Sequence, residues 1–108
     1  MITESKTIDS KAVLEVGPLQ SMFPCSTSKI MDFMITFHRY DYSISDIGKH
    51  SGITFKTALN EVKKLEEQGV LIRTRNVGKA IMFQFNSESI QAKSLRKLCL
   101  DIAKSRIN

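Results

Sequence analysis

Two short helical patterns joined by a tight turn constrain the fold of this 108-residue chain more than any other feature of its sequence. The first helix is predicted over residues 44–50, because Ser43 stands three residues before Asp46, close to the spacing of a capping box. Ser51 and Gly52 end it, since glycine adopts the left-handed conformation of a helix terminus without steric cost. A second helix directly after such a turn forms a helix-turn-helix unit.

The second helix of the unit is predicted over residues 55–68, between Thr54 as the N-cap and Gly69 as the C-terminal glycine. Apolar residues recur in it at steps of three and four, which is the spacing of one buried helix face. The residues expected on that face are Ala58, Val62 and Leu65, with Phe55 and Leu59 widening it.

A hairpin is predicted directly after the helix-turn-helix unit. Residues 70–75 form its first strand, residues 76–79 a polar turn, and residues 80–85 the returning strand. Large apolar residues stand at every second position from Ile81 to Phe85, so one face of the hairpin is expected to be buried.

Helices are also predicted on both sides of this region. An earlier helix begins after Ser26 or Thr27, and a short extended piece over residues 42–43 separates it from the helix-turn-helix unit. A last helix is predicted over residues 89–106. Both show the spacing of a buried face, formed by Ile30, Phe33, Met34 and Phe37 in one and by Leu95, Leu98 and Ile102 in the other.

The N-terminal part of the chain lacks such a pattern. Residues 12–16 are expected to form a short strand, which Gly17 and Pro18 end. A second proline then favours an extended course over residues 19–25. We therefore expect residues 1–25 to form a partly extended arm.

Two stretches of sequence, together with the order of elements, resemble winged helix-turn-helix transcription regulators of the ArsR and MarR groups and their archaeal homologues. The stretches are YSISDIGKHSGIT over residues 42–54 and EVKKLEEQGVL over residues 61–71. The resemblance covers about residues 26–86. It implies a mainly α fold with a small β-hairpin that serves as the wing.

Two departures from that family pattern lie in the helix-turn-helix unit. Gly48 stands where the family often has Ala, and a close approach of the two helices is a reason for glycine there. Asn60 and Glu61 stand where Arg or His is frequent. The family's base preferences are therefore not carried over to this chain.

Three parts are expected from these patterns. They are the N-terminal arm over residues 1–25, a winged helix-turn-helix DNA-binding domain over residues 26–86, and a C-terminal helix over residues 87–108. The resembling regulators commonly pair through terminal helices, so the last part is expected to form a dimer. Two recognition helices about 34 Å apart then read successive turns of the major groove.

The basic residues are concentrated in the last third of the chain. Residues 71–108 carry eight basic and two acidic side chains, whereas residues 1–55 carry five basic and six acidic ones. A basic segment of this kind favours nucleic acid as a partner. A solvated, lysine-rich surface is the alternative interpretation.

The predicted DNA contacts lie on the second helix of the unit and on the hairpin. A helix in the major groove presents polar side chains to base edges and cations to phosphates. Asn60 can bond adenine and Lys56 guanine, whereas Glu61 is expected to be solvated, with cytosine as its lesser alternative. Lys49 is an outlying phosphate candidate. The predicted DNA-binding residues are Thr54, Lys56, Thr57, Asn60, Lys64, Arg73, Arg75 and Lys79.

Two arginines of the hairpin are expected to act together. Arg73 and Arg75 are alternate residues of the first strand, so they are predicted to point to the same face. There they would contact phosphates or the minor groove, with Lys79 just past the tip. Protection of an exposed strand edge against aggregation is the other interpretation of these charges.

No enzyme site and no metal site are predicted. His38 and His50 have no acid and nucleophile at a matched spacing, and Cys25 and Cys99 lack the paired spacing of a zinc site. Cys99 is expected to be a small buried residue. No cofactor is implied, and no apolar run is long enough for a membrane helix, so a cytoplasmic protein without a membrane partner is expected.

The predicted function is a sequence-specific regulator that binds double-stranded DNA as a homodimer. Repression is the expected outcome, because the chain has no separate activation domain. A winged-helix module for protein–protein interaction and a non-specific nucleic-acid binder are the alternatives. The sequence identifies no small-molecule effector.

Overall fold

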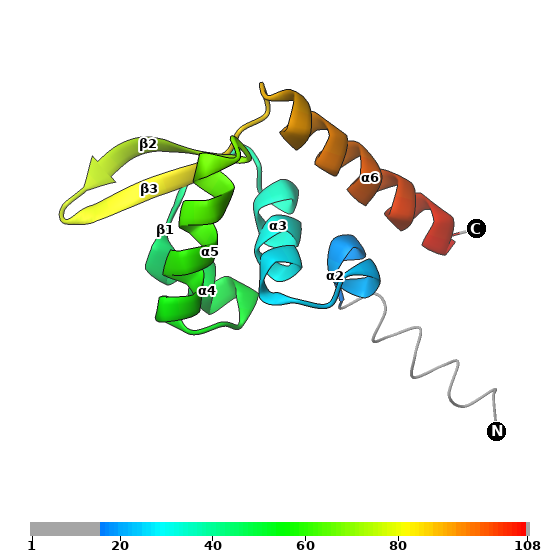
Figure 1. Ribbon diagram of the computed structural model, residues 1–108, viewed down its shortest axis with the longest axis horizontal. Coiled ribbons are helices and arrows are strands. Elements are labelled where there is room, and N and C mark those ends of the chain that lie inside the picture. The colour runs from blue at the N-terminus through cyan, green and yellow to red at the C-terminus, as the bar shows by residue number, and fades with distance from the viewer. Residues whose placement is uncertain (1–15, 108) are drawn as a thin grey trace.

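The computed structural model describes residues 16–107 and has the architecture of a winged helix-turn-helix (Figure 1). Helices α3, α4 and α5 pack against a three-stranded antiparallel sheet with the strand order β1-β3-β2. The predicted fold, mainly α with a small β-hairpin, is confirmed. The elements are α2 (Pro18–Met22), α3 (Ser26–Thr36), β1 (Tyr42–Ser43), α4 (Ile44–Ser51), α5 (Phe55–Glu67), β2 (Leu71–Val77), β3 (Ala80–Phe85) and α6 (Ile90–Ile107).

Helices α4 and α5 form the predicted helix-turn-helix unit. Ser43 Oγ accepts a hydrogen bond from the backbone N–H of Asp46 at 3.1 Å and so caps α4. Gly48 lies where the two helices approach each other. A Cβ atom there would stand 3.2 Å from the carbonyl oxygen of Ile53 and 3.3 Å from Cβ of Ala58. The close approach expected at this glycine is confirmed.

Both helices of the unit end on a left-handed glycine, as predicted. Gly52 follows α4 with a φ of 71°, and Gly69 follows α5 with a φ of 76°. Thr54 caps the start of α5 by accepting a hydrogen bond from the N–H of Thr57. The buried face of α5 consists of Ala58, Val62 and Leu65.

Phe55 does not take the place in the core that its helical spacing predicts. Its side chain is 55% exposed and lines an open groove between α4, α5 and the hairpin. Phe55 is the first residue of α5 and lies one turn before Ala58, where the helix extends beyond the buried core. Leu59, one turn further along the same helix, is half-buried.

The two arginines of the hairpin lie on opposite faces, which corrects the prediction that they share one. Strands β2 and β3 pair with Arg73 opposite Phe83 and Arg75 opposite Met82, so Thr74 is an extra residue. Such a β-bulge inverts the alternation of side chains beyond it. Phe83 and Met82 are neighbours on β3 and face opposite sides, so the arginines opposite them do so as well.

The hairpin, here called the wing, is longer than predicted. Its strands reach Val77 and resume at Ala80, so the turn consists of Gly78 and Lys79 alone. Its buried face is anchored by Phe83 and Phe85, both almost completely buried. Figure 1 shows that the wing extends away from the helices.

Helix α2 occupies part of the segment predicted to run extended over residues 19–25, so that prediction is wrong. Pro18 stands at the first helical position, where its missing N–H costs nothing. The carboxylate of Asp32 on α3 accepts hydrogen bonds from the N–H groups of Leu19 and Gln20, both at 2.9 Å. A carboxylate at a helix N-terminus also stabilises the helix dipole. This contact comes from outside the segment and fixes it as a helix.

Helix α6 packs against α2 and extends on the side of the molecule opposite the wing (Figure 1). Ala92 and Cys99 are buried, which confirms the prediction for Cys99. The predicted apolar residues of this helix, Leu95, Leu98 and Ile102, are half-buried against the core.

The end of α6 is tied to the segment before α2. The guanidinium of Arg106 donates hydrogen bonds to the carbonyls of Val16 and Gly17, both at 3.0 Å. The strand predicted over residues 12–16 lies outside the described residues except for Val16. Within residues 16–107, no helix combines the length and the apolar character needed to cross a membrane.

Candidate nucleic-acid interface

The outward face of α5 carries two lysines and an amide. Lys56, Asn60 and Lys63 are exposed and follow one another at steps of four and three, so they lie on one face. Within residues 16–107, neither lysine makes an ion pair. Both ammonium groups are therefore available to an anionic partner. The prediction omitted Lys63, although its distance of seven residues from Lys56 places it on the same face.

The threonine hydroxyls at the start of α5 serve the helix cap. Thr54 Oγ1 accepts from the N–H of Thr57 at 3.3 Å and donates to Thr57 Oγ1 at 3.0 Å. Both predicted contacts are therefore engaged in the cap, and Thr54 is exposed whereas Thr57 is half-buried.

Glu61 faces the protein rather than solvent, which corrects its prediction as a solvated residue. Its side chain is only 16% exposed. The hydroxyl of Thr27 on α3 donates a hydrogen bond to its carboxylate, and Lys64 Nζ lies 3.6 Å from it. Glu61 thus joins α5 to α3 and is held away from a base edge. Lys64 remains largely exposed, but its charge is already opposed within the helix.

Arg73 is held against α5 by an acidic partner. Its Nε donates to Glu66 at 2.7 Å and its Nη2 at 3.3 Å, and its guanidinium lies 5.7 Å from the ring centroid of Phe83. The same arginine therefore makes a two-bond ion pair and a cation–π contact. This side chain fastens the wing to the second helix of the unit.

Arg75 points to the other face of the wing and is paired with Asp41, just before β1. Its Nε and Nη2 lie 2.9 and 3.1 Å from the two carboxylate oxygens, and the Thr74 hydroxyl donates to the same group. These hydrogen bonds, first from Arg75 and then from Thr74, lower the pKa of Asp41 to about 2. Asp41 is therefore ionised at neutral pH and competes with any phosphate for Arg75.

Lys79 and Lys49 remain without an acidic partner among the described residues. Lys79 follows Gly78 in the exposed turn of the wing, and Lys49 lies in the last turn of α4. Together with Lys56 and Lys63, they place unpaired cations on α4, α5 and the tip of the wing.

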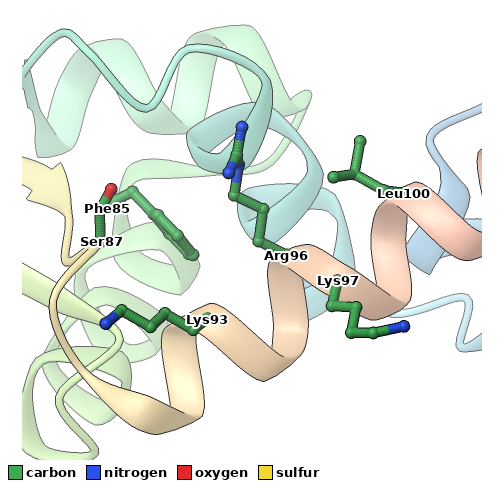
Figure 2. A pocket seen from close by; sticks show the side chains of 6 residues that line it. All are labelled: Phe85, Ser87, Lys93, Arg96, Lys97 and Leu100. Atoms are coloured by element: carbon green, nitrogen blue, oxygen red, sulfur yellow. The ribbon is translucent and has the colours of Figure 1, made fainter.

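A second group of cations lies on α6 and does not form one site. A hollow of about 360 Å³ between α6 and the C-terminal end of β3, at the base of the wing, is lined by Phe85, Ser87, Lys93, Arg96, Lys97 and Leu100. Figure 2 shows that Lys93 and Lys97 point in opposite directions and that Arg96 points away from both. Lys97 Nζ is also paired with Asp101 at 2.8 Å. These three charges do not converge on a single anion.

The histidines have structural contacts. The ring of His50 stacks on Phe33 with 4.9 Å between centroids, and His38 Nδ1 lies 3.0 Å from the carbonyl of Ile35. Within residues 16–107, no group of three or more His, Cys, Asp or Glu side chains is placed to hold a metal ion.

A solved repressor has a similar structure. The crystal structure of the adhesin competence repressor AdcR from Streptococcus pyogenes matches 98% of this chain and 77% of its own, with a TM-score of 0.60 and 16% identical residues. No protein-family model and no curated protein matches the sequence. At this level of identity the similarity establishes the fold, and the chain is a winged helix-turn-helix protein.

Proposed function

We propose that the chain is a transcription regulator that binds double-stranded DNA in a sequence-specific way, with α5 in the major groove. The observation that carries the proposal is the outward face of α5, where Lys56, Asn60 and Lys63 are uncovered by the described protein. The major groove is about 12 Å wide and admits one helix. Asn60 would bond an adenine through its amide, and Lys56 would donate to a guanine or a phosphate.

The charges around α5 support a duplex rather than a protein as the partner. Lys63 on α5, Lys49 on α4 and Lys79 at the tip of the wing have no acidic partners among the residues described. Each lysine that neutralises a phosphate releases counterions and adds about one unit to the salt dependence of binding. The wing arginines would contribute to DNA binding only after Arg73 releases Glu66, and Arg75 releases Asp41, to bind a phosphate instead.

We further propose that residues 26–86 form the DNA-binding domain, and that residues 87–108 pair two copies of the chain, with the N-terminal arm over residues 1–25 contributing. Helix α6 projects from the domain and packs mainly against α2. Exposed apolar side chains on these two helices supply surface for a second copy. They are Met22 on α2 and Ile90, Leu100 and Ile107 on α6, with Phe23 directly after α2.

A dimer places two copies of α5 on successive turns of a duplex, and linking two binding events raises the overall affinity. Occupying a promoter in this way would repress transcription. The solved structure of similar fold is that of a repressor, which supports this direction of regulation.

Selection of bound duplexes from a random pool tests the proposed function, with the mass measured by light scattering in parallel. We expect a shared sequence with two half-sites and a particle of twice the 12.2 kDa chain mass. A protein-interaction module would retain no duplex at low salt. A non-specific binder would retain duplexes without a shared sequence, and a particle of single-chain mass would contradict the dimer.

A further inference from the structure

Phe55 exposes an aromatic ring at the start of the helix that we place in the groove. It is the first residue of α5, directly after the cap Thr54 and before Lys56, which has no ion-pair partner within residues 16–107. More than half of its side chain is accessible, and among the described residues its ring packs against no other aromatic ring. The N-terminal residues of a recognition helix are those that reach base edges.

The surroundings of Phe55 are apolar and basic. With Ile44 at the start of α4 and Ala80 and Ile81 on β3, it lines an open groove of about 380 Å³. The remaining lining residues are two serines and Lys79, so no carboxylate of the described part of the chain lines this groove. A polyanion can therefore contact the cations of the wing and of α5 while one of its apolar groups enters the groove between them.

A duplex presents one apolar group in its major groove, the C5-methyl of thymine, and phenylalanine is one of the side chains that contact it. A benzene ring has no donor or acceptor for the other base edges. We infer that Phe55 is a specificity-determining residue that contacts a thymine methyl at one position of each half-site. This inference rests on the proposed function, because it requires α5 to lie in the groove.

The contact predicts a specific chemical dependence. Replacing that thymine by deoxyuridine removes only the methyl group and leaves base pairing intact. Burying one methyl-sized group contributes a factor of roughly four to affinity. We therefore expect a deoxyuridine at this position to weaken binding about fourfold in each half-site.

The test uses the full chain and the duplex selected from the random pool, with each thymine replaced in turn by deoxyuridine. The measured quantity is the ratio of the dissociation constants for the uracil and thymine duplexes. It is determined for the wild type, for Phe55→Ala and for Phe37→Ala. Phe37 is the control, since it is 43% exposed and directly follows α3, outside the surfaces that we propose for DNA and for the second copy. Circular dichroism checks that all three proteins are folded.

We expect one thymine per half-site at which the ratio is about four in the wild type and in Phe37→Ala but close to one in Phe55→Ala. A selected sequence without thymine, or a ratio unchanged by Phe55→Ala, overturns the inference and leaves the proposed function standing. Failure of the wild type to bind any duplex contradicts the proposed function itself. A Phe55→Ala protein whose mass changes while its ratio does not would assign the ring to contact between copies, which also overturns the inference.

Discussion

Arg75 on the wing donates two hydrogen bonds to the carboxylate of Asp41, so its charge is neutralised within the protein. The bulge at Thr74 makes this pairing possible, because it turns Arg75 to the face opposite Arg73. A phosphate that binds Arg75 must displace a carboxylate that is ionised at neutral pH. If the chain binds DNA as we propose, the wing would contact it through Lys79 first, and Arg75 would follow only by exchange.

Asp41→Asn is expected to strengthen binding to selected and random duplexes alike. The change removes the competing negative charge and frees Arg75 for a phosphate, so the salt dependence should steepen by about one unit per protomer. Affinity measured at several salt concentrations checks this. Asp101→Asn is the matched control, because it removes the same charge from α6, where the partner is Lys97. Equal effects of the two changes would show that the gain in affinity comes from the change in net charge and not from the release of Arg75.

The same ion pair gives an acid-dependent contribution to stability. The pKa of Asp41 is lowered to about 2 in the folded protein from its usual 3.8, so the pair stabilises the fold above the higher value. This contribution is lost as the pH falls from 3.8 towards about 2. The free energy of unfolding should therefore fall more steeply in the wild type than in Asp41→Asn over this interval. If the free energy of unfolding falls equally in the two proteins over this interval, the pairing of Asp41 with Arg75 is contradicted.

Asp32→Asn is expected to loosen α2. The two carboxylate oxygens accept from the N–H groups of Leu19 and Gln20, and an amide turns a donor towards one of them. Loss of one such buried hydrogen bond costs about 1–3 kcal/mol. Denaturant unfolding measures the loss, with Asp46→Asn on α4 as the exposed control. Equal stability of the two variants would contradict the role of Asp32 as the anchor of α2.

The contribution of Asp32 to stability changes with pH in the direction opposite to that of Asp41. Burial raises the pKa of this carboxyl in the folded protein, although the N–H groups of Gln20 and Leu19 act against it. The folded state therefore takes up the proton first, and the contribution of Asp32 to stability grows as the pH falls through the raised pKa.

Lys63→Ala is expected to reduce the salt dependence of DNA binding more than Lys64→Ala. Lys63 has no acidic partner among the described residues, whereas Lys64 Nζ lies 3.6 Å from Glu61. Loss of one phosphate contact should lower the slope by about one unit. The neighbouring lysines provide a matched pair on one helix turn. A larger change in slope for Lys64→Ala would show that the side of α5 in the major groove lies nearer to Glu61 than we propose.

The helix-turn-helix unit could be predicted from the sequence because its signals are local. Ser43 and Asp46 lie three residues apart, and Gly52 and Gly69 determine the helix ends by their own backbone freedom. Local caps and spacing suffice where an element is stabilised by residues within a few positions of it.

The features that the sequence did not predict depend on distant partners. Helix α2 needs Asp32, which lies 13 residues from Leu19, and Glu61 is oriented by Thr27, 34 residues away. The bulge at Thr74 has no local signal, since residues 73–76 are all polar and show no alternation, and the Thr74 side chain reaches Asp41. The exposed position of Phe55 likewise depends on how far α5 extends beyond the core.

The affinity of Asn60→Ala for the selected duplex and for a scrambled duplex tests most directly whether α5 reads base sequence. If the amide makes two hydrogen bonds to adenine, its removal should weaken the selected complex by about 1–3 kcal/mol and leave the scrambled complex nearly unchanged. Lys79→Ala, the control at the wing tip, should weaken both complexes alike. An equal loss on both duplexes for Asn60→Ala would contradict base reading by α5 through this residue.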